Sequence, residues 1–160
     1  MKTKYSRISL MIMGLSLLSA LFLLVVPTVY IAQQSKAVMG YTSVFGGHIY
    51  NFSTTQSKVY VYPSAGGITT FCLALASLPL IALFGKNNKS PYFFSFCLNV
   101  AVFILCFFQA NFFVGTNVTI YRLPATYTVN FVGAYLVMVT SFLGGVISLV
   151  GLLKKPNKRY

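Results

Sequence analysis

Four long apolar segments interrupt the chain, at residues about 8–32, 67–84, 92–114 and 129–153, and none contains a charged side chain. A helix needs about 20 apolar residues to cross the hydrocarbon core of a bilayer, and each segment has about that length. Inside a bilayer the backbone must satisfy its own hydrogen bonds, which restricts such segments to helices. The sequence therefore predicts an all-α membrane protein built on a transmembrane bundle of four helices.

The charged residues are of one sign, because the 160 residues include 12 Lys and Arg but no Asp or Glu. Charged residues make up 8% and hydrophobic residues 57% of the chain, against about 25% and about 45–50% in soluble domains. The basic residues lie beside the apolar segments rather than along a basic helix, which favours a lipid bilayer over nucleic acid as the partner. A chain without carboxylates lacks the Asp and Glu side chains that most often serve acid–base catalysis and bind hard metal ions, so we expect no enzyme, cofactor or metal site.

The distribution of basic residues predicts the orientation in the membrane. Nine would share one side: Lys2, Lys4, Arg7, Lys86, Lys89, Lys154, Lys155, Lys158 and Arg159. The other side would receive Lys36, Lys58 and Arg122. Because basic residues accumulate on the cytoplasmic side, we expect a cell-membrane protein with both termini in the cytoplasm. The single domain, 1–160, would then have outer loops at 33–66 and 115–128, an inner loop at 85–91 and a cytoplasmic tail at 154–160.

The first apolar segment has an alternative interpretation as a cleaved signal peptide. Its start is basic, and Ser35-Lys36-Ala37 resembles a cleavage site with small residues around one variable position. Its apolar run is longer than the 7–15 residues typical of a signal core, which favours a helix that is retained. Cleavage would leave three spans and an external N-terminus.

The outer loops have strand character. Residues 44–52 and 58–62 of the first loop, and 118–122 and 127–129 of the second, are rich in aromatic and β-branched residues bounded by turn residues. A lone hairpin is marginally stable, so we expect the two loops to pair into one small extracytoplasmic β-sheet. The alternative is two irregular loops with aromatic anchors at the lipid headgroups.

The expected topology resembles that of claudin-type membrane proteins, which have four spans, internal termini and a large first outer loop with strands. The resemblance is one of topology. The first-loop pattern of Trp, Gly-Leu-Trp and two cysteines is missing, because the chain has no Trp and its three cysteines fall within the apolar segments. No functional residue is therefore transferred from that family.

Small and polar residues at helical spacing predict the faces by which the helices pack, since lipid gives no hydrophobic drive for association. The fourth segment contributes Gly133, Thr140, Gly144 and Ser148 to one stripe. The third carries Asn99 and Gln109, whose amides should face protein rather than lipid. The expected role of this polar stripe is to hold helices together. The alternative role is a path for a solute or ion.

The cysteines and the histidine give little indication of a metal, redox or catalytic site. Cys72, Cys97 and Cys106 form no metal-binding or redox spacing and are expected to be buried thiols. His48 has no carboxylate that could serve as its partner.

The outer loops also carry the candidate binding residues, which are His48, Tyr50, Tyr60, Tyr62 and Tyr121. Tyrosine is favoured in binding hot spots, although an interfacial belt or a small core would use the same residues. Period-two alternation puts Tyr60 and Tyr62 on one sheet face. We expect that face to be buried against the second loop, with His48 and Lys58 exposed.

These patterns favour a small polytopic membrane protein that acts by binding. The expected role is an accessory, assembly or recognition subunit of a larger membrane complex. The alternative is a small homo-oligomeric channel or transporter for a neutral or small solute.

Overall fold

Four long helices dominate the protein. A computed structural model of the chain describes residues 7–27, 29–31, 36–51, 58–61, 63, 65–84, 89–116, 118–120, 127–129 and 132–153. The long helices are α1 (Arg7–Val25), α3 (Ala65–Phe84), α4 (Ser90–Thr116) and α5 (Val132–Leu153). Each is long and apolar enough to cross a membrane, so the four predicted spans are confirmed and indicate a multi-pass membrane protein.

Two of the predicted span boundaries were wrong. The first helix ends at Val25 rather than near 32, because Pro27 follows and proline disfavours helix at the residue before it. The chain then enters strand β1 (Val29–Ile31). Strand β6 (Tyr127–Val129) occupies the predicted start of the fourth span, and α5 begins only at Val132.

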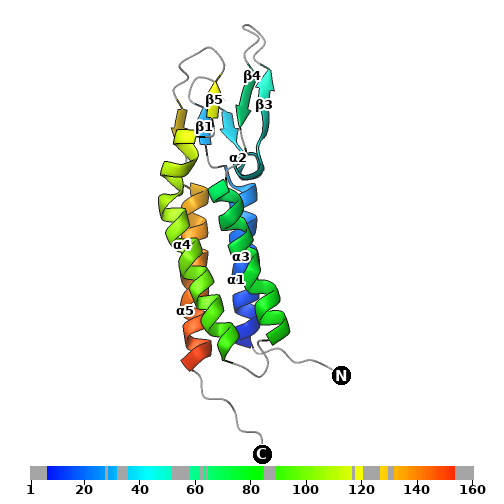
Figure 1. Cartoon of the computed structure of the whole chain (residues 1–160), viewed down its shortest axis with the longest axis vertical. Helices are drawn as coiled ribbons and strands as arrows, with labels where there is room; N and C mark the ends of the chain where they lie inside the picture. Colours follow the sequence, from blue (N-terminus) through cyan, green and yellow to red (C-terminus); the bar gives the residue numbers. More distant parts are fainter. Residues whose placement is uncertain are drawn as a thin grey trace, which may run out of the picture.

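The helices form an elongated bundle in which α1 and α4 each pack against both α3 and α5. The start of α1 and the end of α5 lie at one end of this bundle, and the strands lie at the other (Figure 1). We call the two ends the terminal end and the strand end.

Regular spacing of the buried positions explains how the helices pack. The residues facing the bundle interior are Gly67, Thr70, Ala74, Ser77 and Ile81 in α3, and Tyr92, Ser95, Asn99, Val102 and Cys106 in α4. Both series alternate steps of three and four residues. That alternation keeps one seam facing the neighbouring helices, as in left-handed coiled coils and most bundles of four helices.

At the strand end, the described residues contain two three-stranded antiparallel sheets. Strands β2 (Lys36–Val38), β1 and β6 form one sheet, in that order, and β3 (Gly47–Asn51), β4 (Lys58–Val61) and β5 (Val118–Ile120) form the other. The expectation of a single sheet was therefore wrong. The second loop divides its two strands between separate sheets, so each sheet joins distant parts of the chain.

The first predicted strand also began too early. Val44 and Phe45 belong to a short helix, α2 (Gly40–Phe45), rather than to the strand expected at 44–52. Gly46 follows with φ of 80° and ψ of 170°, a positive-φ conformation that glycine adopts without steric cost. Strand β3 can start only after this reversal, at Gly47.

Candidate functional site

The interior of the bundle is lined with hydroxyl groups. Buried serine and threonine side chains are Ser9, Ser16, Ser19, Thr70, Ser77, Ser95, Thr140, Ser141 and Ser148. Most of the large apolar side chains of the long helices are instead exposed or half-buried, and a few, such as Leu23 and Ile81, are buried. In lipid this inverted distribution is favourable, because the outer apolar groups lose nothing in hydrocarbon and the inner hydroxyls find partners on other helices.

Hydroxyl pairs connect α1 to each of the other three long helices. The Ser9 hydroxyl lies 2.9 Å from the Tyr92 hydroxyl of α4, and Ser16 is hydrogen-bonded to Ser77 of α3. Ser19 donates to Thr140 Oγ1 of α5 at 2.7 Å. The Thr140 hydroxyl can in turn donate to the Leu136 carbonyl, 2.9 Å away. Each contact of this kind is worth about 0.6–2 kcal/mol in a membrane.

Asn99 is the central polar residue of the α4–α5 contact, and its side chain is buried. Its amide donates from Nδ2 to the Ser95 carbonyl at 2.8 Å. The Ser148 hydroxyl of α5 lies 3.2 Å from the Ser95 hydroxyl and 2.7 Å from the Gly144 carbonyl. A Cβ at Gly144 would lie 2.7 Å from Asn99 Oδ1, so the missing side chain is what lets α5 approach the amide.

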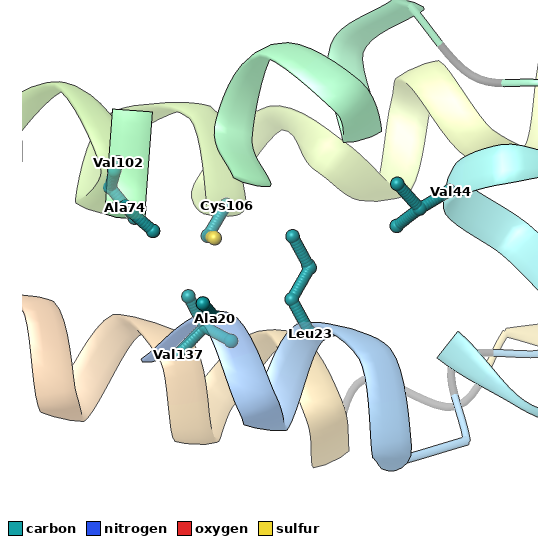
Figure 2. Packing of buried hydrophobic residues seen from close by; sticks show 7 residues of the cluster. All are labelled: Ala20, Leu23, Val44, Ala74, Val102, Cys106 and Val137. Atoms are coloured by element: carbon teal, nitrogen blue, oxygen red, sulfur yellow. The ribbon is translucent and has the colours of Figure 1, made fainter. Parts of the chain in front are cut away.

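We call the buried serine and threonine hydroxyl groups together the hydroxyl layer. Two apolar clusters lie at different levels of the same bundle. The cluster toward the strand end comprises Ala20, Leu23, Val44, Ala74, Val102, Cys106 and Val137, which Figure 2 shows converging from α1, α2, α3, α4 and α5. The cluster toward the terminal end comprises Ile12, Ile81 and Tyr92. Along α1, α3 and α4, Ser16, Ser19, Ser77 and Ser95 fall between these two groups, whereas Ser9 precedes Ile12 and Thr70 precedes Ala74.

One buried hydroxyl in this layer is different. Among the described residues, the Ser141 Oγ atom is buried without a hydrogen-bond partner. An unpaired buried hydroxyl costs about 1–3 kcal/mol.

Of the predicted packing residues, Gly133, Thr140, Gly144 and Ser148 all lie on the buried side of α5. Asn99 faces them from α4. Gln109 belongs to α4, but its side chain is outside the described residues. The expected burial of the cysteines was wrong for two of the three, because Cys72 and Cys97 are exposed and Cys106 alone is buried.

The outward face of α3 differs from those of the other long helices. Bulky exposed side chains are Leu10, Met11, Leu17, Leu18 and Leu21 on α1, Phe93, Phe94, Val100, Ile104 and Phe107 on α4, and Tyr135, Val139, Phe142, Leu143, Val146, Leu149 and Val150 on α5. On α3 no bulky side chain is exposed between 65 and 82. Its exposed residues in that range are Ala65, Thr69, Cys72 and Pro79. Ala76, at the same helical spacing, is half-buried, as are the bulky residues Ile68, Phe71, Leu73, Leu75, Leu78 and Leu80.

Steps of four and three separate Ala65, Thr69, Cys72, Ala76 and Pro79, as they separate the buried residues on the opposite side of the helix. The helix therefore has two seams of small residues, one toward its own bundle and one away from it. We call the second seam the α3 outer seam.

The short helix α2 covers the strand end of the bundle. Its Val44 side chain has 0% exposure and enters the apolar cluster between the long helices (Figure 2). A Cβ at Gly40 would lie 2.1 Å from the Leu23 carbonyl oxygen, so only glycine fits where α2 meets the last turn of α1. Phe45 packs edge to face against Phe71 of α3, with ring centroids 5.5 Å apart.

The predicted outer-face residues fall in or near the β3–β4–β5 sheet. His48 is directly opposite Tyr60, which is opposite Thr119 of β5. Directly opposed positions share a face of an antiparallel sheet. The burial of the His48 and Tyr60 side chains lies outside the described residues, so the predicted exposure of His48 and burial of Tyr60 stays a prediction. A register shift after His48 brings Tyr50 opposite Val59, on the other face. Tyr62 and Tyr121 lie outside the described residues, and of Lys58 only the backbone is described.

Sequence reasoning missed the α1 contribution to the site. Ser9, Ser16 and Ser19 share one side of the helix with Ile12 and Leu23, at alternating steps of three and four. That spacing was a usable signal, but serine is common in long apolar segments and no glycine marked the stripe. The Tyr92 hydroxyl gave no local signal, because its partner lies 83 residues away.

Comparisons of the chain with known protein families, with curated proteins and with solved structures give no match.

Proposed function

We propose that this protein is an accessory subunit that docks into a larger membrane complex through the α3 outer seam, and that it acts by binding rather than by chemistry. Both termini lie in the cytoplasm, and the two sheets lie outside the cell membrane. This topology resembles that of claudin-type proteins. The basic residues support the orientation, because exposed Arg7 and Lys89 lie at the terminal end, and most of the other basic residues are close to these two or to the end of α5 in the sequence.

The observation that carries this proposal is the size of the side chains along the α3 outer seam. Small residues let two helix backbones approach closely, which is what drives helix association in lipid. The buried seam of α3 has the same alternation of three and four residues and is also made mostly of small residues, and it faces other helices. A lipid-facing surface has no need of small residues, as the Leu-rich and Phe-rich outward faces of α1 and α4 illustrate. The α3 outer seam is therefore suited to a helix of another protein.

The native cysteines allow a direct test. Cys72 lies on the α3 outer seam, and Cys97 is exposed on α4. The variants Cys97→Ser and Cys72→Ser each retain one exposed thiol, which a membrane-permeable photocrosslinker can label in the host's own membranes. We expect the Cys97→Ser variant, labelled at Cys72, to crosslink to a different polypeptide. The matched Cys72→Ser variant, labelled at Cys97, should give lipid adducts only. Equal crosslinking from both variants, or none from either, contradicts the proposal.

A substitution complements the crosslinking. Ala76→Leu fills the α3 outer seam, whereas Val100→Leu enlarges an already bulky outward position on α4. We expect the first variant to fold but to lose the partner on purification, and the second to retain it. If a folded Ala76→Leu variant still retained the partner, the partner would bind to a surface other than the α3 outer seam, which contradicts the proposal.

The orientation is tested separately with topology reporters. A reporter active in the cytoplasm should function when fused at Lys89 or after Tyr160, and one active outside should function at Thr55. An external C-terminus contradicts the proposed topology.

A second candidate function is a small homo-oligomeric channel or transporter. The unpaired Ser141 hydroxyl within the interior hydroxyl layer favours it, because a passing solute or water could satisfy that group. Solute flux in proteoliposomes that is lost in a folded Ser141→Ala variant would support this function over the accessory role. Unchanged permeability in wild-type proteoliposomes would leave the accessory role.

A further inference from the structure

The short helix α2 has an exposed aromatic face. Tyr41 and Phe45 lie one helical turn apart and are 55% and 47% exposed. Thr42 and Val44, on other sides of the helix, are buried against the bundle. None of the residues of α2 is charged. The helix is thus anchored by one side and presents two aromatic rings on another.

The depth of α2 relative to the bundle follows from helix geometry. At 1.5 Å per residue, the 19 residues of α1 span about 28 Å, close to the hydrocarbon thickness of about 30 Å. Arg7 begins this span at the terminal end. At the other end Gly40 lies against the Leu23 and Val26 carbonyls. Helix α2 therefore lies about one hydrocarbon thickness away from the basic residues of the terminal end.

We propose that α2 is an interfacial helix whose aromatic face, formed by Tyr41 and Phe45, rests in the headgroup region of the outer leaflet. Tyr and Trp concentrate at this level of a membrane, where the Tyr41 ring would meet hydrocarbon and its phenol would meet water, and Phe45 would add a second apolar ring. Because α2 carries no charge, its ligand is the zwitterionic lipid surface rather than a specific anionic headgroup. The edge-to-face contact of Phe45 with Phe71 joins the aromatic face to the apolar flank of α3.

This inference goes beyond the accessory role and does not depend on the α3 outer seam. It assigns to α2 the function of setting how deeply the strand end stands in the membrane. Interfacial helices bury their apolar face about 5–10 Å into the boundary between headgroups and acyl chains. With Gly40 wedged against the α1 backbone, the anchoring of α2 is transmitted to the whole bundle.

The chain has no Trp, so single-tryptophan variants give an unambiguous signal. Tyr41→Trp and Phe45→Trp would be reconstituted separately into phosphatidylcholine liposomes containing lipids brominated either near the headgroup or near the chain end. We expect quenching by the shallow bromines to exceed quenching by the deep bromines by about twofold for both variants, given the stated depth. Acrylamide in the buffer should quench them less than it quenches free N-acetyltryptophanamide.

Phe142→Trp is the matched control, because Phe142 is exposed near the middle of α5. It should show the reverse preference, with stronger quenching by the deep bromines. Gly40→Ala in the Tyr41→Trp background should detach α2 and remove the preference for shallow bromines.

Three results would overturn the inference. Acrylamide quenching of the Tyr41→Trp and Phe45→Trp variants equal to that of the free compound would place α2 in water. Protection from both acrylamide and brominated lipid would show that protein covers it. A preference for deep bromines would put it in the hydrocarbon core.

Discussion

Two adjacent glycines of α5 make the packing of the bundle interior testable. Gly144 and Gly145 are both buried, but they meet α4 differently. A Cβ at Gly144 would lie 2.7 Å from Asn99 Oδ1, closer than atoms tolerate, whereas a Cβ at Gly145 would lie 3.8 Å from Asn99 Cβ, an ordinary contact. We therefore predict that Gly144→Ala destabilises the bundle and that Gly145→Ala does not.

The expected change in the free energy of unfolding is the sum of two costs and one gain. An added methyl in a filled site costs about 1–3 kcal/mol. The Asn99 amide cannot move away without weakening its 2.8 Å hydrogen bond to the Ser95 carbonyl of the same helix, a bond worth about 0.5–1.5 kcal/mol. Replacing glycine with alanine within a helix recovers about 0.5–1 kcal/mol. The balance is a loss of about 2 kcal/mol in the free energy of unfolding for Gly144→Ala. For Gly145→Ala the free energy of unfolding should stay unchanged or increase by up to about 1 kcal/mol.

Unfolding in mixed micelles with increasing SDS, followed by circular dichroism, measures both variants on the same scale. The identity of the clashing partner is tested by adding Asn99→Ala, which removes Oδ1. The double variant Gly144→Ala/Asn99→Ala should be more stable than the sum of the single effects by about 1 kcal/mol or more, since the residues are in contact. Equal stability of Gly144→Ala and Gly145→Ala, or strict additivity in the double variant, would refute this account of the α4–α5 contact.

Three further outcomes are expected. Gly151→Ala places a Cβ 2.6 Å from the Tyr92 ring and should lower the free energy of unfolding by about 1–3 kcal/mol, with a smaller loss for Tyr92→Phe in the same SDS titration. Gly40→Ala meets backbone rather than a side chain and should cost about 3 kcal/mol or release α2, seen as new protease cleavage at the strand end. A maleimide dissolved in the lipid should label Cys97 in the folded protein and Cys106 only after unfolding, and equal labelling rates would contradict the assigned faces.

The agreement between sequence and structure was best where the pattern was local. Four uncharged apolar segments predicted four long helices, and glycine and hydroxyl spacing in the fourth segment predicted the buried side of α5. The serine stripe of α1 had the same spacing but was missed, because each serine was an isolated polar residue within an apolar run. The interior hydroxyl layer became visible only when Ser9, Ser16 and Ser19 were found opposite partners on three other helices.

The strand end was predicted less well for a related reason. The pattern around Val44 favoured a strand, but the contact of Gly40 with α1 and the positive φ of Gly46 produce a helix there instead. Tertiary contacts override weak propensity in so short a segment. The division of the outer strands into two sheets depends on which distant segments pair, and no short-range signal specifies that choice.

By itself, the sequence determined that this chain forms four long apolar helices, because charge and hydropathy act along the chain and need no partner. The distribution of its basic residues likewise predicts an orientation. Only the tertiary structure decided which residues each helix turns inward and which it leaves outside. Those two sides of a helix can have the same composition, as on α3, where the buried seam and the outer seam are both made of small residues. Which seam meets its own bundle depends on where the neighbouring helices stand, and that is a property of the assembled fold.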